Sequence, residues 1–526
     1  MRDYHRPGRS PVLAEGGLCA TSHPRAALLA VETLRRGGNA VDAAIAGAVA
    51  LGVCEPHMCG IGGDCFALVS PGEGRPVRAL NGSGRAPAGA DAEALRARGE
   101  AAVPLGDVQA VTVPGAVDAF CRLSAEMGRL GIADTLGPVA ALFDDGVPVA
   151  PRVAFDWPGA AAALRGAARE RFLRDGRPLA QGERFALPAQ AEVLRRVAAE
   201  GRRGFYEGAV AADMVAALRA AGGAHDEGDF ARTEATWDEP IGGGYRGADL
   251  LEHPPNGQGA AAILMLNVLA RLEVGGLDPW GAPRAHLHAE AARLAYDARD
   301  RFLADPDRTA RLAHMLAPET ADRLAALVDP ARAGGPALLR RAEAVHRDTV
   351  LITVVDRDRM AVSLIYSLFH GFGAGLASDR FGVLFHNRGA GFTLERGHPN
   401  ELLPGRRPLH TIIPAMLAEG GRVTMPFGVM GGQYQAAGHA WMLSNLRDHG
   451  LDPQAAIDAP RLFPEGGVLK VERGFPEATR AALAAMGHRV EVPHGPIGGA
   501  QAIRIDPAGY LEGASDPRKD GCALGY

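Results

Sequence analysis

The chain is poor in cysteine and has no dense run of basic residues. It carries six cysteines among 526 residues, with no Cys-x-x-Cys pair, and its formal net charge is −5. A nucleic-acid-binding surface requires clustered Lys and Arg, so we do not expect one. A zinc site built from His57, Cys59 and Cys65 would have a spacing that matches no standard zinc pattern. The sequence therefore predicts reduced structural thiols, and neither a metal nor an organic cofactor.

The chain also lacks a long hydrophobic run. Its most apolar stretch, residues 40–53, is only about fourteen residues long, whereas a membrane-spanning helix needs about twenty. Residues 1–11 are polar and basic, and no apolar segment of the kind required by a secretory signal follows them. We therefore expect a cytoplasmic protein that does not enter a membrane.

What is present is the composition of a globular protein, with 47% apolar and 22% charged residues. The small side chains of residues 40–53 predict a helix packed on every side, and residues 285–303 predict a long helix. Strands are predicted at 382–386, 411–415 and 423–427, among others. Because strands in both halves are flanked by helices, we expect an α/β sandwich whose sheets are completed by both parts of the chain.

Two runs rich in β-branched residues, 346–356 and 361–367, flank a short charged turn and predict a β-hairpin. Asp348 followed by Thr349 near the start of the first strand suggests an internal cleavage site. The segment before it, 331–344, is rich in Ala, Gly and Arg and poor in large apolar residues, so a cleavage site there would be accessible. The alternative is a polar turn that leads into a buried strand.

Cleavage before Thr349 would create a nucleophile with its own base. A Thr hydroxyl is a weak nucleophile and needs an adjacent group to take its proton. The α-amine of an N-terminal residue has an ordinary pKa of about 7.7 to 8.0, so it is partly deprotonated near neutral pH and can accept that proton. One residue then supplies both catalytic roles.

Short motifs spread in order along nearly the whole chain indicate a family. They lie at residues 34–44, 55–57, 60–63, 113–115, 205–208, 354–356, 361–363, 372–375, 407–408, 430–432, 513–518 and 525–526. Each is weak alone, but together they are specific. On these motifs the chain resembles the γ-glutamyltranspeptidase family of N-terminal-nucleophile hydrolases.

The resemblance implies an α+β fold, a four-layer αββα sandwich. It also implies an inactive precursor that cuts itself between Asp348 and Thr349. The large fragment, 1–348, and the small fragment, 349–526, would remain associated as one unit, and such heterodimers can pair into a dimer of heterodimers.

The resemblance also implies which residues act in catalysis. Thr349 falls on the nucleophile, and Ser367 falls on a second hydroxyl residue that supports it from the paired strand. Gly431 and Gly432 fall on the glycines whose N–H groups stabilise the oxyanion, donors that are typically worth about 2.7 to 4 kcal/mol each. The structural alternative for these two glycines is a tight turn after a strand.

The substrate-binding positions depart from the family pattern. Glutamyl-transferring members hold the substrate α-carboxylate with an Arg, and the aligned position is Ser83, with Arg85 two residues away. A Ser pair that also binds this carboxylate is replaced by His410 and Thr411. The acidic residue that receives the α-amino group is replaced by Gly391, which removes a contact of roughly 1.5 to 3 kcal/mol.

A further departure is Phe369, which stands where the family has an Asn. The acyl-transfer residues are therefore kept while the glutamyl-binding residues are changed. We expect Arg85, Arg388, His410 and Thr411 to hold a carboxylate that has no neighbouring amine, as in oxamate or a glutaryl group.

Three functional hypotheses follow. The first is a self-processing γ-glutamyl hydrolase or transpeptidase that passes the acyl group of a small-molecule amide, such as glutathione, to water or an amine. The second is a related amidohydrolase for another acid amide, similar to oxamate amidohydrolases or glutaryl acylases. The third is a non-catalytic scaffold or binding protein that has kept the fold. Self-cleavage would separate the third from the others.

Overall fold

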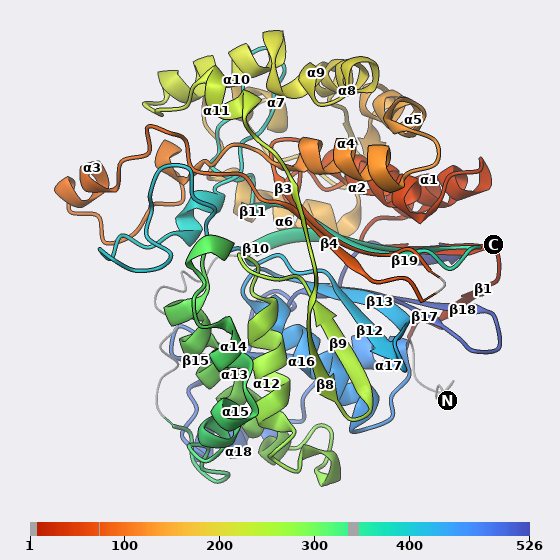
Figure 1. Cartoon of the computed structure of the whole chain (residues 1–526), viewed down its shortest axis with the longest axis vertical. Coiled ribbons are helices and arrows are strands. Elements are labelled where there is room, and N and C mark those ends of the chain that lie inside the picture. Colours follow the sequence, from red (N-terminus) through yellow and green to blue (C-terminus); the bar gives the residue numbers. More distant parts are fainter. Residues whose placement is uncertain (1–7, 73, 335–346) are drawn as a thin grey trace.

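Two seven-stranded sheets lie face to face at the centre of the molecule (Figure 1). The computed structural model describes residues 8–72, 74–334 and 347–526. The first sheet has the order β1 (Val12–Ala14), β18 (Leu511–Ser515), β17 (Gly499–Ile505), β13 (Arg422–Met430), β12 (Ala415–Glu419), β9 (Ala248–Glu252) and β8 (Ile241–Tyr245). The second has the order β19 (Cys522–Gly525), β2 (Gly17–Thr21), β10 (Arg347–Asp356), β11 (Ala361–His370), β3 (Asp64–Ser70), β4 (Arg78–Gly82) and β7 (Thr236–Asp238).

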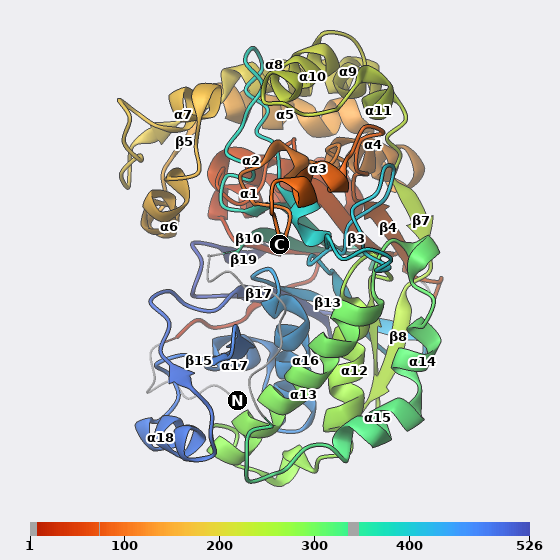
Figure 2. The ribbon, with the colours of Figure 1, turned by 90° about the vertical axis from the view of Figure 1, so that its left-hand side faces the viewer.

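Helices cover the outer face of each sheet, which completes four layers (Figures 1 and 2). The layer over the second sheet includes α1 (Pro24–Arg35), α2 (Ala40–Cys54), α4 (Ala116–Met127) and α5 (Ile132–Asp145). Farther from this sheet lie α8 (Pro188–Glu200), which packs on α5, and α10 (Gly208–Ala220) (Figure 1). The layer over the first sheet includes α12 (Gly259–Leu269), α13 (Ala282–Phe302), α15 (Pro318–Ala325), α16 (Tyr434–Arg447), α17 (Pro453–Asp458) and α18 (Glu477–Ala485). Beside α18 lies a small sheet of β14 (Leu462–Glu465), β15 (Val468–Val471) and β16 (Val490–Glu491).

The predicted hairpin is confirmed at the centre of the second sheet. Strands β10 and β11 pair antiparallel, and β10 also pairs with β2. Their β-branched and aliphatic side chains fill both faces, because one face packs on helices and the other on the first sheet. The two sheets meet closely where Leu351 of β10 lies against Gly428 of β13: a Cβ atom on Gly428 would come within 2.9 Å of the Leu351 side chain.

The predicted buried helix is confirmed as α2, in which every residue is buried. Its small side chains allow α1, α5 and β10 to pack around it. Asn39 and Asp42 form a capping box at its start, which satisfies N–H groups that would otherwise be unpaired. The N–H of Ala40 donates to the carboxylate of Asp356 at the end of β10, so the helix is fixed to the central hairpin.

Two predicted strands are wrong. Residues 382–386 form no strand and make a single bridge, between Ala377 and Leu384. Residues 411–414 lie outside any strand, and β12 begins only at Ala415. Side chains, rather than a neighbouring strand, pair with backbone N–H groups of this second segment: Gln435 accepts the N–H of Ile413, and His410 accepts the N–H of Ile412.

Both sheets contain strands from before and after Thr349, as expected from the sequence. Removing either part of the chain would therefore leave both sheets incomplete. In the part of the chain that the structure describes, no helix combines the length and apolar character needed to cross a membrane.

Candidate active site

Thr349 lies at an irregularity in the central hairpin, opposite Ser367. The register between β10 and β11 shifts between Asp348 and Val350, so Thr349 falls at a bulge in the ladder. Bulges reorient a side chain relative to its strand and are frequent beside active sites. The Thr349 hydroxyl lies 3.4 Å from the Ser367 hydroxyl, and both residues are buried. The structure thus brings together the two hydroxyl residues predicted from the sequence.

Ser367 is held from two sides. Its Oγ accepts a hydrogen bond of 2.8 Å from the N–H of Phe369 and lies 3.5 Å from Nη2 of Arg388. Phe369 has a φ of 82°, a backbone conformation that bulky residues rarely adopt. This unusual conformation directs its N–H toward the hydroxyl of Ser367.

Arg388 is a fully buried cation next to these hydroxyls. Its Nη1 donates to the Thr411 hydroxyl over 2.9 Å, and its guanidinium lies 4.0 Å from the centre of the Phe369 ring. Among the residues that the structure describes, no carboxylate oxygen lies within 4 Å of this guanidinium, and its Nε has no hydrogen-bond partner. Burial lowers the pKa of Arg388 to about 9, although the charge of Asp64 opposes the shift. The site therefore holds positive charge that an anionic ligand could neutralise.

His410, predicted to bind substrate, has both ring nitrogens engaged within the protein. Nε2 lies 3.1 Å from the carboxylate of Asp64, and Nδ1 accepts the N–H of Ile412. Burial, reinforced by the charge of Arg388, lowers the pKa of His410 to about 3, so the ring is neutral. For Asp64, burial would raise the pKa, but His386, His410 and Arg388 lower it to about 2. His410 therefore orients a buried carboxylate and has no free nitrogen for a substrate.

Arg85, the other predicted carboxylate ligand, points elsewhere. Its guanidinium lies 3.4 Å from Asp305 and 3.0 Å from the carbonyl of Gly405, and nearly half of its side chain is exposed. Ser83 is buried and accepts a hydrogen bond from Asn256. Of the four predicted substrate-binding residues, the structure brings only Arg388 and Thr411 together beside the paired hydroxyls.

Gly431 and Gly432 form the turn that follows β13. Their φ values are 123° and 59°, which favour glycine, and a Cβ atom on Gly431 would lie 2.9 Å from Cα of Gly498. Within the described residues, neither N–H donates a hydrogen bond to the protein. Gln258 donates to the carbonyl oxygens of both Gly432 and Thr411, so it connects this turn to the hydrogen-bond partner of Arg388.

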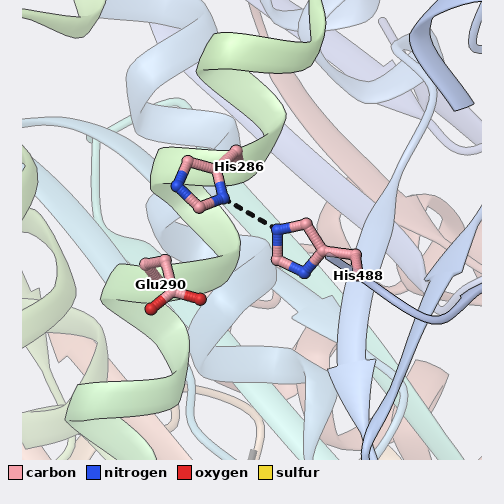
Figure 3. Close-up of side chains that lie close together, drawn as sticks. All are labelled: His286, Glu290 and His488. Carbon is pink, nitrogen blue, oxygen red and sulfur yellow. Dashed lines mark hydrogen bonds between the residues drawn. The ribbon is translucent and has the colours of Figure 1, made fainter. Parts of the chain in front are cut away.

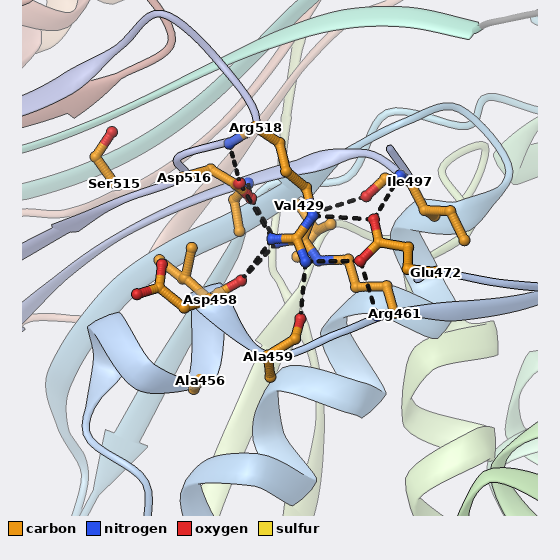
Figure 4. A network of polar contacts seen from close by, with 12 residues as sticks. Val429, Ala456, Asp458, Ala459, Arg461, Glu472, Ile497, Ser515, Asp516 and Arg518 are labelled. Carbon is orange, nitrogen blue, oxygen red and sulfur yellow. Dashed lines mark hydrogen bonds and ion pairs between the residues drawn. The ribbon is translucent and has the colours of Figure 1, made fainter. Parts of the chain in front are cut away.

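A buried ionic network contacts β17, the strand that pairs with β13 just before this turn (Figure 4). Arg461 and Arg518 both bond to Asp516, and Arg518 also bonds to Glu472 over 2.7 Å. Asp516 accepts the N–H of Ala500, which is in β17, the strand that pairs with β13 next to Gly431. The motif at 513–518 therefore fixes the backbone that packs behind the glycine turn.

A cavity of about 1140 Å³ opens beside the cluster. Its lining includes Gln433 as well as Phe369 and Thr411, which connect it to the residues described above. Gly391 also lines it, and a Cβ atom at this position would lie 2.5 Å from the carbonyl oxygen of Leu409. The backbone therefore leaves no room at Gly391 for the acidic side chain that glutamyl-transferring enzymes are expected to have there.

The sequence analysis missed two residues of this site. Asp64 ends a glycine-rich loop that reads as a tight turn, and Gln258 lies in a Pro- and Gly-rich loop. Both are fully buried polar residues that join distant segments. A buried polar partner cannot be recognised from its neighbours in sequence, so only their occurrence in glycine-rich loops was available as a signal.

The comparisons with known proteins agree with this geometry. A family profile described as Gamma-glutamyltranspeptidase matches residues 26–526. The chain is 34% identical over 505 residues to the Glutathione hydrolase-like YwrD proenzyme of Bacillus subtilis (strain 168), covering 94% of this chain and 95% of that protein. It is 33% identical over 534 residues to the Oxamate amidohydrolase proenzyme of Klebsiella pneumoniae subsp. pneumoniae, covering 97% and 98%.

Among solved structures, the cephalosporin acylase from Bacillus halodurans matches over 100% of this chain and 99% of that chain. The TM-score is 0.91 and the sequence identity is 35%. The predicted α+β, four-layer sandwich is confirmed by this likeness and by the arrangement of the two sheets.

Proposed function

The chain belongs to the gamma-glutamyltranspeptidase family, and we propose that it is made as a precursor that cleaves itself between Asp348 and Thr349. Enzymes of this family are amidohydrolases or acyltransferases with an N-terminal Thr nucleophile, and two relatives described above are named proenzymes. The fragments 1–348 and 349–526 would stay associated, since each sheet contains strands from both.

In the proposed reaction, the free α-amine of Thr349 takes the proton from its own hydroxyl. The hydroxyl oxygen then attacks the amide carbonyl of the substrate, and the N–H groups of Gly431 and Gly432 stabilise the oxyanion. The proton passes to the leaving amine as the C–N bond breaks, which leaves an ester on Thr349. Water, or an amine acceptor, then attacks the ester and releases the acyl group. Ser367 keeps the Thr349 hydroxyl oriented over 3.4 Å.

We propose that the acyl group carries a carboxylate without a neighbouring amine. The single observation that carries this proposal is the buried guanidinium of Arg388, which lies beside Ser367 and Thr411 and has no carboxylate oxygen within 4 Å among the described residues. A planar guanidinium binds a carboxylate through two parallel hydrogen bonds. Gly391 offers no acid to an α-amino group. A small amide acid such as oxamate, or a glutaryl amide, has the required charge.

Hydrolysis or transpeptidation of γ-glutamyl compounds such as glutathione is the second candidate. It is supported by the name of the Bacillus subtilis relative, Glutathione hydrolase-like YwrD proenzyme, and by the match with the whole family. Arg388 would bind the same α-carboxylate, and the α-amino group would have to find a backbone acceptor instead of an acid.

The two candidates are separated by a matched pair of substrates, glutaryl-p-nitroanilide and γ-glutamyl-p-nitroanilide, which differ only in the α-amino group. We expect a higher kcat/KM for the glutaryl compound, and oxamate is tested in the same series. Faster release from the γ-glutamyl compound would favour the second candidate. If the chain is cleaved but hydrolyses neither compound, both proposed acyl groups are rejected.

The nucleophile is tested with Thr349→Ala, which should remain a single chain and show no activity. The control is Thr353→Ala, which removes a buried Thr hydroxyl from the same strand. This hydroxyl lies 3.4 Å from the carbonyl oxygen of Ala20 and makes no contact with Ser367. This control should be cleaved and active. A cleaved or active Thr349→Ala protein would contradict the assignment.

A further inference from the structure

A second cluster of reactive side chains lies in the outer helix layer (Figure 3). His286 and Glu290 are one turn apart on α13, and His488 comes from the connection between α18 and β16. One ligand atom from each residue lies within 4.8 Å of the other two. His286 and Glu290 are buried, and His488 is half-buried. The proposed reaction uses none of these residues.

The hydrogen bonds of His286 leave one nitrogen ready to bind a metal. Its Nε2 lies 2.8 Å from the carbonyl oxygen of Asp329, which can only accept, so this nitrogen carries the proton. In the neutral ring, Nδ1 then presents its lone pair to Nε2 of His488 at 2.8 Å. A metal-binding His commonly donates its other N–H to a backbone carbonyl, which fixes the ring and its tautomer. His286 already has this arrangement.

Glu290 contributes the negative charge of the cluster. It is 2% exposed, and both hydrogen bonds that it receives from Arg293 fall on the same oxygen, Oε2. A Cβ atom on Gly334 would lie 2.7 Å from this oxygen, so the backbone also closes over the carboxylate. Within the described residues, Oε1 receives no hydrogen bond from the protein, so it is the oxygen left for a cation.

We propose that His286, Glu290 and His488 bind a divalent transition metal of the zinc class. Two imidazole nitrogens and one carboxylate oxygen form a ligand set that suits zinc, and water would supply the fourth ligand. The metal would replace the proton that lies between His286 Nδ1 and His488 Nε2, and binding would release this proton. With Zn–N distances of about 2.0 to 2.1 Å in tetrahedral geometry, the two nitrogens would move apart by roughly 0.5 Å. His488, half-buried on a connection, can make this movement more easily than His286.

The position of the cluster gives the metal a structural role. His286 and Glu290 precede Thr349, whereas His488 follows it, so the metal would join the two fragments; this consequence rests on the proposed cleavage. The two fragments already contact each other in this region, since the N–H of Ala333 donates to the carbonyl of Met486 over 2.8 Å. The metal would therefore add a bond to an existing contact between the fragments.

Zinc binding to the untagged full-length protein tests the proposal. After removal of metals with a chelator, titration with zinc should show one tight site per chain. Replacement of a ligand in His488→Ala should weaken that site by more than about 100-fold, because changes at residues that only support a ligand already cost 10- to 100-fold. Glu290→Gln should also weaken it. His494→Ala removes an exposed His six residues away and should leave the affinity unchanged.

The absence of a stoichiometric site in the wild type, or equal affinity in His488→Ala, would overturn the proposal. Cobalt gives a second readout, since Co²⁺ in a site with nitrogen and oxygen ligands should produce visible absorption that His488→Ala lacks. The titration is repeated on Thr349→Ala. An uncut precursor that still binds zinc separates the metal site from the proposed cleavage, and a cleaved wild type that binds none rejects the metal site alone.

Discussion

Two buried arginines close to the glycine turn have opposite surroundings. Arg518 bonds to both Asp516 and Glu472, whereas Arg388 has no carboxylate oxygen within 4 Å among the described residues. Burial alone would lower both pKa values. The acidic partners instead raise the pKa of Arg518 above its usual value, while the pKa of Arg388 falls to about 9.

The difference indicates what each cation is for. A buried charge that is neutralised within the protein contributes to the fold, and removal of one partner is costly because the other charge is left unpaired. A buried charge without a partner is unfavourable until something neutralises it. We therefore interpret Arg518 as a structural residue and Arg388 as a binding residue whose partner arrives with the substrate.

The largest expected effect concerns the paired cation. Arg518→Met should lower the free energy of unfolding by about 3 to 5 kcal/mol, because Glu472 and Asp516 would lose a partner in the interior. The melting temperature measures the loss. Arg504→Met is the control. Arg504 also forms an ion pair, with Glu512, but the Arg504 side chain is 42% exposed, so its replacement should change the melting temperature little. Equal melting temperatures for Arg518→Met and the wild type would break the comparison.

The unpaired cation should behave in the opposite way. Arg388→Met should lower kcat/KM for a glutaryl amide by roughly 10- to 150-fold, which corresponds to the loss of a charge-assisted contact of about 1.5 to 3 kcal/mol. The melting temperature should stay the same or rise, because an unpaired buried charge has been removed.

The matched substrate for this test is the same amide with its carboxylate methylated. Arg388→Met should not slow hydrolysis of this neutral compound relative to the wild type. An equal loss for the charged and the neutral compounds would mean that Arg388 acts on Ser367 or Thr349 and does not recognise the acyl carboxylate.

A smaller effect is expected in the wall of the cavity. Gly391→Ala places a Cβ atom 2.5 Å from the carbonyl of Leu409 and should cost about 1 to 3 kcal/mol of stability. Gly137→Ala is the matched control, because a Cβ atom at Gly137 in α5 meets nothing within 4 Å. Thermal unfolding of the two variants gives the comparison. A fully stable Gly391→Ala protein would show that the loop can move and admit a side chain.

The smallest effect concerns a buried neutral His. Burial lowers the pKa of His225 from 6.5 to about 4. As the pH falls below 6.5, His225 takes up a proton in the unfolded chain, whereas in the folded protein it stays neutral until about pH 4. The free energy of unfolding therefore decreases as the pH falls from 6.5 to about 4, and this contribution is fully present above that window. From pH 7 to pH 5.5 the loss is about 1 kcal/mol. His225→Gln should flatten the pH dependence of the melting temperature; an unchanged slope would contradict this.

The parts of the fold that depend on local pattern could be predicted from the sequence. The β-branched runs gave the β10–β11 hairpin, and the run of small residues gave the buried helix α2. The strands expected at 382–386 and 411–415 failed because their backbone groups are satisfied by turns and by side chains such as Gln435. No local pattern contains that information.

The candidate site shows the same division. The family resemblance implied that Thr349, Ser367, Gly431 and Gly432 belong together, but it could not distinguish Arg388 from Arg85. Both are Arg residues close to a predicted site, yet one is fully buried beside Ser367 and the other bonds to Asp305 near the surface. That distinction depends on which distant segments fold over each side chain.

The central claim is that Thr349 becomes the first residue of a second polypeptide. The most direct measurement is N-terminal sequencing of the fragments of purified wild-type protein, together with their intact masses. The account predicts a fragment that runs from Thr349 to Tyr526 and begins Thr-Val-Leu-Ile-Thr. A single uncut chain that is stable for days near neutral pH, or a fragment that begins at another residue, would contradict it.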